Sequence, residues 1–272
     1  MLYASEIIKI AEAEVGYLEK ASNASLDSVT GNAGYGNYTK YARDLHNAGF
    51  FNGNKNGYAW CAVFVTWAAW VLCGKDRSRA EKLLCQTGPY GASCTSAAQY
   101  YKQQGRFYTS DPKPGDQIFF WDAAKTCAVH TGIVVDVDDT YVYTIEGNTS
   151  SAAGVVENGG GVFNKRYSLD YNRIYGYGRP KYDEESNATT TTTQKEEGFK
   201  VNMKTLKKGC YGKQVKTLQA LLIGYGYDCG RSGADGDFGG ATDSAVRKYQ
   251  VRNGLTVDGV AGPKTWSKLL GQ

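Results

Sequence analysis

The stretch Ala128–Asn148, "AVHTGIVVDVDDTYVYTIEGN", decides the fold of the N-terminal part of this 272-residue chain. Two runs within it alternate apolar and other residues, with the period of two that marks one buried face of a strand. The Asp138-Asp139 pair between the runs indicates a turn. For both apolar faces to coincide in a hairpin, paired positions must sum to an even number, so we predict a connection of three residues. The alternating residues are Ile133, Val135, Val137, Tyr141, Tyr143 and Ile145.

The same register gathers polar side chains on the opposite face of the hairpin. A pairing sum of 276 sets His130 opposite Glu146, whereas a sum of 278 sets it opposite Asn148 with Glu146 on the diagonal. Either alignment brings a carboxylate and an amide within side-chain reach of the imidazole.

Upstream, the stretch Gly57–Cys73, "GYAWCAVFVTWAAWVLC", carries Cys61 at the head of an almost wholly apolar helix. Because its faces are mostly apolar, we expect this helix to be central and buried. A helix N-terminus and a nearby imidazolium both lower the pKa of a thiol. A thiol, an imidazole and an orienting carboxylate are together the parts of a cysteine hydrolase.

The chain divides at residues 183–198, "DEESNATTTTTQKEEG", a polar stretch of low complexity that is typical of a flexible linker. We therefore predict a domain over residues 1–182 and a second over 199–272. The first reads as α+β, with an amphipathic N-terminal helix, a short helix at Ala97–Gln104 and a β region from "PKPGDQIFFW" (Pro112–Trp121) to about Pro180.

The second domain contains an internal repeat. Asp235–Thr242 ("DGDFGGAT") and Asp258–Thr265 ("DGVAGPKT") share the pattern DGxxGxxT, 23 residues apart, and each precedes an apolar helical pattern. A third helix, with Val215, Leu218 and Leu222, comes before them. We predict a compact helical module of about 70 residues.

Charge is distributed unevenly between the two parts. From Phe199 onward the chain holds 12 Lys and Arg against 5 Asp and Glu, a net +7, whereas residues 1–198 hold 19 against 22 and carry −3. The basic part favours a polyanionic partner. Nucleic acid would suit the charge alone, but no recognition motif accompanies it, so we expect none. No apolar run approaches 18 residues, and we expect no membrane partner.

The seven cysteines are an odd number without CxxC spacing. Charges at Glu6, Lys9 and Glu12 break any signal-peptide core, so we expect reduced thiols made in a cytoplasm. Only His46 and His130 could join them as zinc ligands, and neither stands at ligand spacing, so we expect no metal and no cofactor. Four cysteines read as structural, and a further two could pair outside the cell. These are Cys73, Cys85, Cys94 and Cys127, and then Cys210 and Cys229.

The chain contains three motifs in the order "WCAVFV" at Trp60, "HTGIVV" at His130 and "IEGN" at Ile145. In these motifs and their order it resembles the CHAP family, the cysteine, histidine-dependent amidohydrolases/peptidases. The resemblance covers most of residues 5–180. The resemblance implies a papain-like core that cuts peptidoglycan. It implies Cys61 as nucleophile, His130 as base, Glu146 as the group that orients it and Asn148 as a polar aid near the imidazole.

Some CHAP members bind calcium through two Asp residues, nine and seven positions before the cysteine. Here those positions hold Asn52 and Asn54, whose neutral amides are weaker ligands for a hard cation. Calcium binding at this place stays open.

The C-terminal part resembles the peptidoglycan-binding type 1 domain over about Leu206–Leu270, through "GKQVKTLQALL", "DGDFG" and "GLTVDGVAGPKTW". This implies a three-helix domain that binds the cell wall.

Together these features predict a peptidoglycan hydrolase that cuts either the muramoyl–alanine bond, as an amidase, or a bond within the stem peptide, as an endopeptidase. The expected partner is bacterial peptidoglycan. The lack of a signal-peptide core and the reduced cysteines favour a phage endolysin that is held in the host cytoplasm until lysis, and a bacterial autolysin is the alternative. The rival functions are a catalytically inert wall-binding protein and a glycosidase, which would need paired carboxylates at a cleft.

Overall fold

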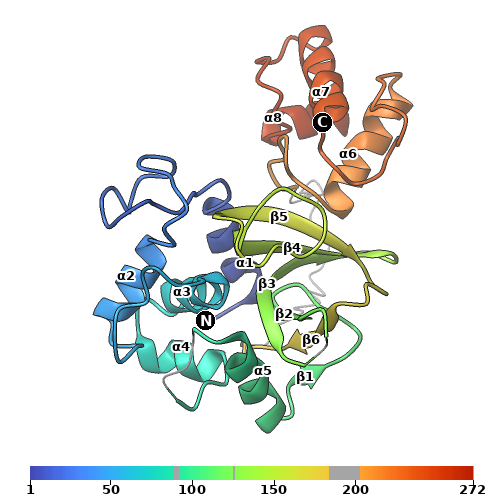
Figure 1. Ribbon diagram of the computed structural model, residues 1–272. Helices are drawn as coiled ribbons and strands as arrows, with labels where there is room; N and C mark the ends of the chain where they lie inside the picture. Colours follow the sequence, from blue (N-terminus) through green and yellow to red (C-terminus); the bar gives the residue numbers. More distant parts are fainter. Residues whose placement is uncertain (89–91, 125, 184–202, 272) are drawn as a thin grey trace. The chain divides into compact units, whose positions relative to one another are not determined.

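A six-stranded sheet forms the centre of the first domain, in the order β1-β6-β2-β3-β4-β5, and every pairing in it is antiparallel (Figure 1). The predicted α+β class is confirmed. The sheet begins with β1, which precedes the predicted start of the β region at Pro112. The strands are β1 (Phe107–Tyr108), β2 (Gln117–Trp121), β3 (Ala128–Val137), β4 (Tyr141–Thr149), β5 (Gly161–Ser168) and β6 (Ile174–Gly178).

In the described part of the chain, five helices precede the strands. The apolar stretch that begins at Cys61 is the central helix α3, as predicted, and its residues from Cys61 to Trp70 are all buried. The amphipathic N-terminal helix is also confirmed. The polar helix α4 is an addition that the apolar pattern did not predict; it begins where the Asp76 carboxylate accepts a hydrogen bond from Arg79 N at 3.0 Å. The helices are α1 (Ala4–Ala13), α2 (Lys40–Asn47), α3 (Cys61–Leu72), α4 (Arg77–Leu83) and α5 (Cys94–Gln103).

The computed structural model describes residues 1–88, 92–124, 126–183 and 203–271. The chain divides into two units, residues 1–185 and 186–272. Apart from Asp183, the linker predicted over residues 183–198 lies outside the described residues.

The hairpin of β3 and β4 has the predicted three-residue connection, in which Asp138 Oδ1 accepts hydrogen bonds from the backbone N–H groups of Thr140 and Tyr141. Ile133 pairs with Ile145, a sum of 278, which is the second of the two expected alignments. Nearer the turn a bulge shifts the register by one.

Both faces of this hairpin are buried. The alternation of apolar residues in the sequence indicated only one of these two faces. Ile133 and Ile145 pack into the core that contains the helices α1 and α3. The other face packs into a second cluster on the far side of the sheet. That cluster contains Ile118, Phe120, Val134, Val142, Tyr167 and Tyr177.

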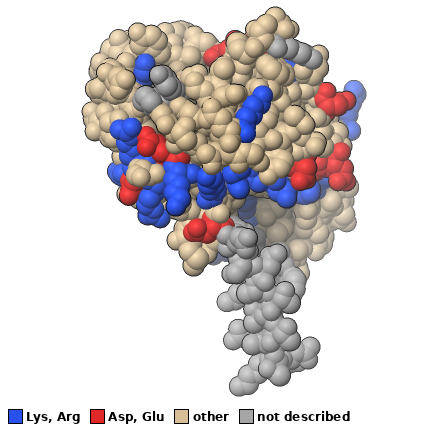
Figure 2. Space-filling view, turned by 90° about the horizontal axis from the view of Figure 1, so that it is seen from below, with Lys and Arg blue, Asp and Glu red and all other residues tan. Residues whose placement is uncertain are grey.

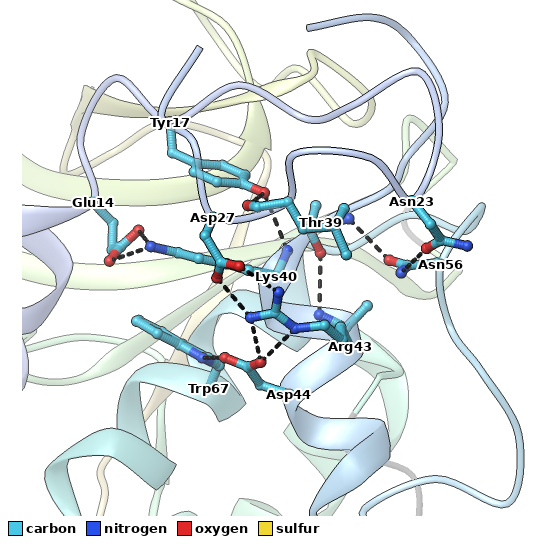
Figure 3. A network of polar contacts seen from close by, with 12 residues as sticks. Glu14, Tyr17, Asn23, Asp27, Thr39, Lys40, Arg43, Asp44, Asn56 and Trp67 are labelled. Atoms are coloured by element: carbon cyan, nitrogen blue, oxygen red, sulfur yellow. Dashed lines mark hydrogen bonds and ion pairs between the residues drawn. The ribbon is translucent and has the colours of Figure 1, made fainter. Parts of the chain in front are cut away.

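A network of polar contacts fastens α2 and the preceding loops to α3 (Figure 3). The Asp44 carboxylate accepts a hydrogen bond from the Trp67 indole at 3.0 Å and forms an ion pair with Arg43, which in turn pairs with Asp27. Asp44 is therefore a structural residue. His46, on the same helix, is exposed.

The second domain contains three helices in its described part, α6 (Lys213–Gly224), α7 (Gly240–Arg252) and α8 (Pro263–Leu269), as predicted. Its repeat has a physical basis that the DGxxGxxT pattern does not include. In the second copy, the buried Gln250 amide donates to Asp258 Oδ1, Val260 O and Thr265 Oγ1, and accepts from Gly259 N. In the first copy, Gln219 makes the equivalent set of contacts.

Candidate active site

Cys61 is the first residue of α3, and its side chain is buried. Trp60, at the N-cap, provides no side-chain hydrogen bond, so the first N–H groups of the helix have no capping side chain. The pKa of Cys61 is lowered well below its usual value. A hydrogen bond with Cys94 is the largest cause; burial opposes it, and the interaction with His130 lowers the pKa further.

His130 and Glu146 form a buried pair. Nε2 of the imidazole lies 2.9 Å from Glu146 Oε2, and neither side chain is exposed to solvent. An added Cβ on Gly132 would lie 2.4 Å from Glu146 Cγ, so the glycine leaves the space that the methylene groups of Glu146 fill. The sequence-predicted imidazole and carboxylate are thus in direct contact.

The Glu146 carboxylate is held on both oxygens. Thr144 Oγ1 donates to Oε1 at 2.6 Å, and the Tyr167 hydroxyl donates to Oε2 at 3.1 Å. Burial and the nearby carboxylate raise the pKa of Tyr167, so this hydroxyl keeps its proton and remains a donor. The carboxylate is fixed in orientation before any substrate binds.

The imidazole has a raised pKa, and its charged form is stabilised. Burial by itself lowers the pKa of His130, but the interactions with Cys61 and Glu146 outweigh it and raise the pKa to about 10. Nδ1 is buried without a hydrogen-bond partner within the usual distance limits. Because Nε2 is occupied by Glu146, Nδ1 is the nitrogen left to act on Cys61.

Asn148 is buried but does not hydrogen-bond to the imidazole. Its Nδ2 donates to Glu157 O at 3.3 Å, and its Oδ1 has no hydrogen-bond partner. Its backbone has φ of +56°, in the left-handed region that Asn tolerates. The register explains its presence in this part of the sheet but does not give it a direct contact with His130.

Two sets of contacts fix the start of α3, one with β4 and one with the segment that follows α1. An added Cβ on Gly147 would lie 2.6 Å from Phe64 Cβ and 2.8 Å from Trp60 Cζ3, so only glycine allows this close approach. The buried carboxylate of Glu19 accepts a hydrogen bond from Trp60 Nε1 at 2.8 Å. Trp60 is thereby fixed next to the cysteine.

Sequence reasoning missed two residues that contact this cluster. Cys94, expected to be structural, lies with its Sγ 3.5 Å from Cys61 Sγ. Tyr167 contacts Glu146, and extension of the hairpin register to β5, where Tyr167 pairs with Val142, would have placed it on the same face. No sequence pattern indicated Cys94, because its segment and that of Cys61 meet only through tertiary packing.

Asn54, one of the two residues considered as calcium ligands, takes part in another contact. Asn54 Oδ1 accepts a hydrogen bond from Asn56 N, and Asn56 in turn accepts from Thr39 N. Within the described residues, no three His, Cys, Asp or Glu side chains gather as a metal site. None of the seven cysteines, Cys210 and Cys229 included, forms a disulfide bond in the structure.

Comparison with known families agrees with this geometry. Residues 53–148 match the CHAP domain family, and residues 211–269 match a family described as a peptidoglycan binding domain. The chain thus carries a CHAP domain followed by a peptidoglycan-binding domain. In the described part of the chain, no helix is both long and apolar enough to cross a membrane.

Several characterised proteins share part of the sequence. The chain is 41% identical over 75 residues to N-acetylmuramoyl-L-alanine amidase CwlL of Bacillus licheniformis, which covers 28% of this chain and 21% of that protein. It is 42% identical over 65 residues to the zinc D-Ala-D-Ala carboxypeptidase of Streptomyces albus G, covering 24% and 26%. The crystal structure of Burkholderia AP3 phage endolysin is 46% identical, covers 25% of this chain and 26% of that one, and has a TM-score of 0.23.

These matches are partial. The chain spans only about a fifth to a quarter of the length of the two curated relatives. Stretches of 75 and 65 residues are too short to extend over both domains, so the names of these proteins do not by themselves define the reaction at Cys61.

Proposed function

We propose that this chain is a peptidoglycan hydrolase that opens an amide bond by nucleophilic attack of the Cys61 thiolate. The observation that carries the proposal is the buried cluster of Cys61, His130 and Glu146, which come from α3, β3 and β4. It stands in a chain whose other domain belongs to a peptidoglycan-binding family.

The contacts support a two-step acyl transfer. The Cys61 sulfur attacks the amide carbonyl carbon, and the uncapped N–H groups at the start of α3 stabilise the resulting oxyanion. His130 gives its Nδ1 proton to the leaving amine as the C–N bond breaks, which leaves a thioester on Cys61. Water, deprotonated by His130, then attacks the thioester and releases a carboxylic acid and the thiolate.

Glu146 supports the imidazolium through this sequence. Its carboxylate holds the Nε2 proton, so the ring keeps Nδ1 directed toward the cysteine and its positive charge is compensated. Asn148 has no contact with the imidazole that would give it a part in proton transfer. We assign it the lesser role of shaping the strand end beside Glu146.

The substrate is an amide of the bacterial wall, either the muramoyl–alanine bond or a bond in the stem peptide. Mass spectrometry of digested walls separates these two possibilities. Intact stem peptides with new N-terminal amines indicate an amidase, and new ends within the peptides indicate an endopeptidase. Action at the wall suits a phage endolysin and a bacterial autolysin equally.

The C-terminal domain carries the chain to its substrate. Its net +7 charge complements an anionic cell wall. Lys and Arg side chains also gather in a band across the face seen in Figure 2, so basic charge is concentrated on that face.

Substitution of the nucleophile tests the proposal. Cys61→Ser in the full chain is expected to abolish lysis of bacterial walls in a zymogram while wall pull-down is retained. Cys73→Ala, which removes another buried thiol of the same domain, serves as the control and keeps its activity. Lysis by the Cys61→Ser protein would contradict the proposal, and iodoacetamide-resistant lysis would favour a glycosidase.

A further inference from the structure

Cys94 is a thiol that the proposed reaction does not use, although it touches the sulfur that reacts. Its Sγ lies 3.5 Å from Cys61 Sγ, and both side chains are buried. This distance is well above the length of a disulfide bond, about 2.05 Å, and both residues are free thiols. The two sulfurs are therefore hydrogen-bonding partners.

The fold fixes Cys94 through the same strand that carries the imidazole. Cys94 is the first residue of α5, whose N-cap Ser93 accepts a hydrogen bond from Ser96 N at 3.2 Å. Thr95 Oγ1 donates to Ala128 O at 3.1 Å and fastens the first turn of α5 to the start of β3, two residues before His130. Cys94 thus has a defined position relative to both Cys61 and His130.

The surroundings decide which sulfur carries the charge. His130 acts on Cys61 and lowers its pKa, together with the hydrogen bond from Cys94. The pKa of Cys94 is raised well above its usual value, first by the bond with Cys61 and then by burial. Two adjacent buried thiols do not ionise together, so Cys61 is the thiolate and Cys94 keeps its hydrogen.

We propose that Cys94 is a positioning residue of this active site, whose S–H donates a hydrogen bond to the Cys61 thiolate and holds that sulfur, charged, beside His130. This inference rests on the proposed function, because it adds a partner to the same nucleophile. Once Cys61 sulfur is part of a neutral thioester, it is a weaker acceptor. Cys94 therefore stabilises the resting thiolate more than the acyl-enzyme and extends activity to lower pH.

The test measures the rate at which iodoacetamide alkylates Cys61 as a function of pH, in the reduced full-length protein, by mass spectrometry of the peptide that contains it. Cys94→Ala removes the donor, and we expect the apparent pKa of Cys61 to rise by about one unit, a tenfold loss of thiolate at acid pH. Cys94→Ser keeps an O–H donor and stays close to wild type. Cys73→Ala, a buried thiol elsewhere in the domain, leaves the pKa unchanged.

The same shift is expected in wall lysis. The acid limb of the rate moves to higher pH in Cys94→Ala, whereas the rate at alkaline pH stays near that of wild type, a pattern that a loss of folding would not produce. Should Cys94→Ala not fold, Cys94→Val provides a second donor-free variant.

An unchanged Cys61 pKa in the donor-free variant overturns the role of Cys94, as does a pKa in Cys94→Ser that rises as far as in Cys94→Ala. The alkylation assay needs no wall substrate. Lysis by Cys61→Ser would overturn the proposed function instead, and the two failures are therefore distinguishable.

Discussion

His130 Nε2 lies 2.9 Å from Glu146 Oε2, and both side chains are entirely screened from solvent. In such a place a carboxylate acts on the imidazolium without competition from water. Thr144 and Tyr167 hold the carboxylate in turn. The charge of Glu146, and not only its shape, is thus available to the imidazole.

Glu146→Gln separates charge from shape. The amide has nearly the same size but does not support the imidazolium, so we expect kcat/KM on walls to fall about 100-fold or more. The pKa of His130 should also fall. Rates measured across the pH range check both effects, with Glu81→Gln, a partly exposed carboxylate paired with Arg77, as the control. A Glu146→Gln protein with the wild-type rate and profile would show that Glu146 is structural.

The pH dependence of the wild-type protein follows from two opposite shifts. The pKa of Cys61 is lowered and that of His130 is raised to about 10, so the thiolate and the imidazolium coexist between the two values. We expect kcat/KM to rise as Cys61 ionises at acid pH, to stay level through neutrality and to fall as His130 loses its proton near pH 10. A rise only near pH 9, the usual range of a thiol, would contradict the ion pair.

The raised pKa of His130 also makes the stability of the folded protein depend on pH. Because the folded protein binds this proton more tightly than the unfolded chain, the contribution of His130 to stability is complete below about pH 6.5. It is lost as the pH rises through about 10. Denaturant unfolding of wild type and Glu146→Gln at several pH values measures it, and the difference between the two proteins should shrink toward alkaline pH.

The hairpin shows why part of the site could be predicted from sequence. The period of two in Ala128–Asn148 fixes which residues share a face, because a slip by one would expose the apolar side. His130 and Glu146 therefore had to be neighbours. The pattern left two alignments open, and it did not reveal the bulge near the turn, which depends on local backbone geometry.

Residues that meet only through packing could not be found this way. Cys94 approaches Cys61 because α5 is fastened to β3 through Thr95, and no periodicity relates the two segments. Asn148 shows that the register alone does not fix the direction of a side chain. It lies on the strand where the register places it, but its left-handed backbone turns its side chain to the loop at Glu157.

A buried glutamine contacts each repeat of the second domain, Gln219 the first and Gln250 the second, and these contacts should be essential for stability. Gln250→Leu leaves the buried N–H of Gly259 without its acceptor, at a cost of about 1–3 kcal/mol, and it also removes the hydrogen bonds to Asp258 and Val260 O. We expect thermal unfolding of this domain at a lower temperature and loss of wall binding, while hydrolysis of soluble muropeptides persists.

Lys248→Leu is the matched control, because it places the same apolar side chain at an exposed position of α7. If the two leucine variants unfold at the same temperature, the contacts of Gln250 do not contribute to the stability of the domain.

The first domain should carry the catalytic activity and the second the binding to the wall. A fragment that ends at Asp183 holds the whole proposed site and should hydrolyse soluble muropeptides at close to the full-length rate. On intact walls at low enzyme concentration it should be slower, because the second domain no longer raises the local concentration of enzyme at the substrate. Added salt should narrow the gap, since screening weakens contacts between exposed charges, including those of the +7 region.

The converse fragment, residues 199–272, should pellet with walls and cut nothing. Both fragments are compared with the full chain in pull-down and turbidity assays, at low and high salt. A heat-denatured sample of residues 199–272 controls for nonspecific adsorption of a basic polypeptide. Should the native fragment stay in the supernatant at low salt, the second domain does not target the wall, and the slower lysis by the first fragment would need another cause.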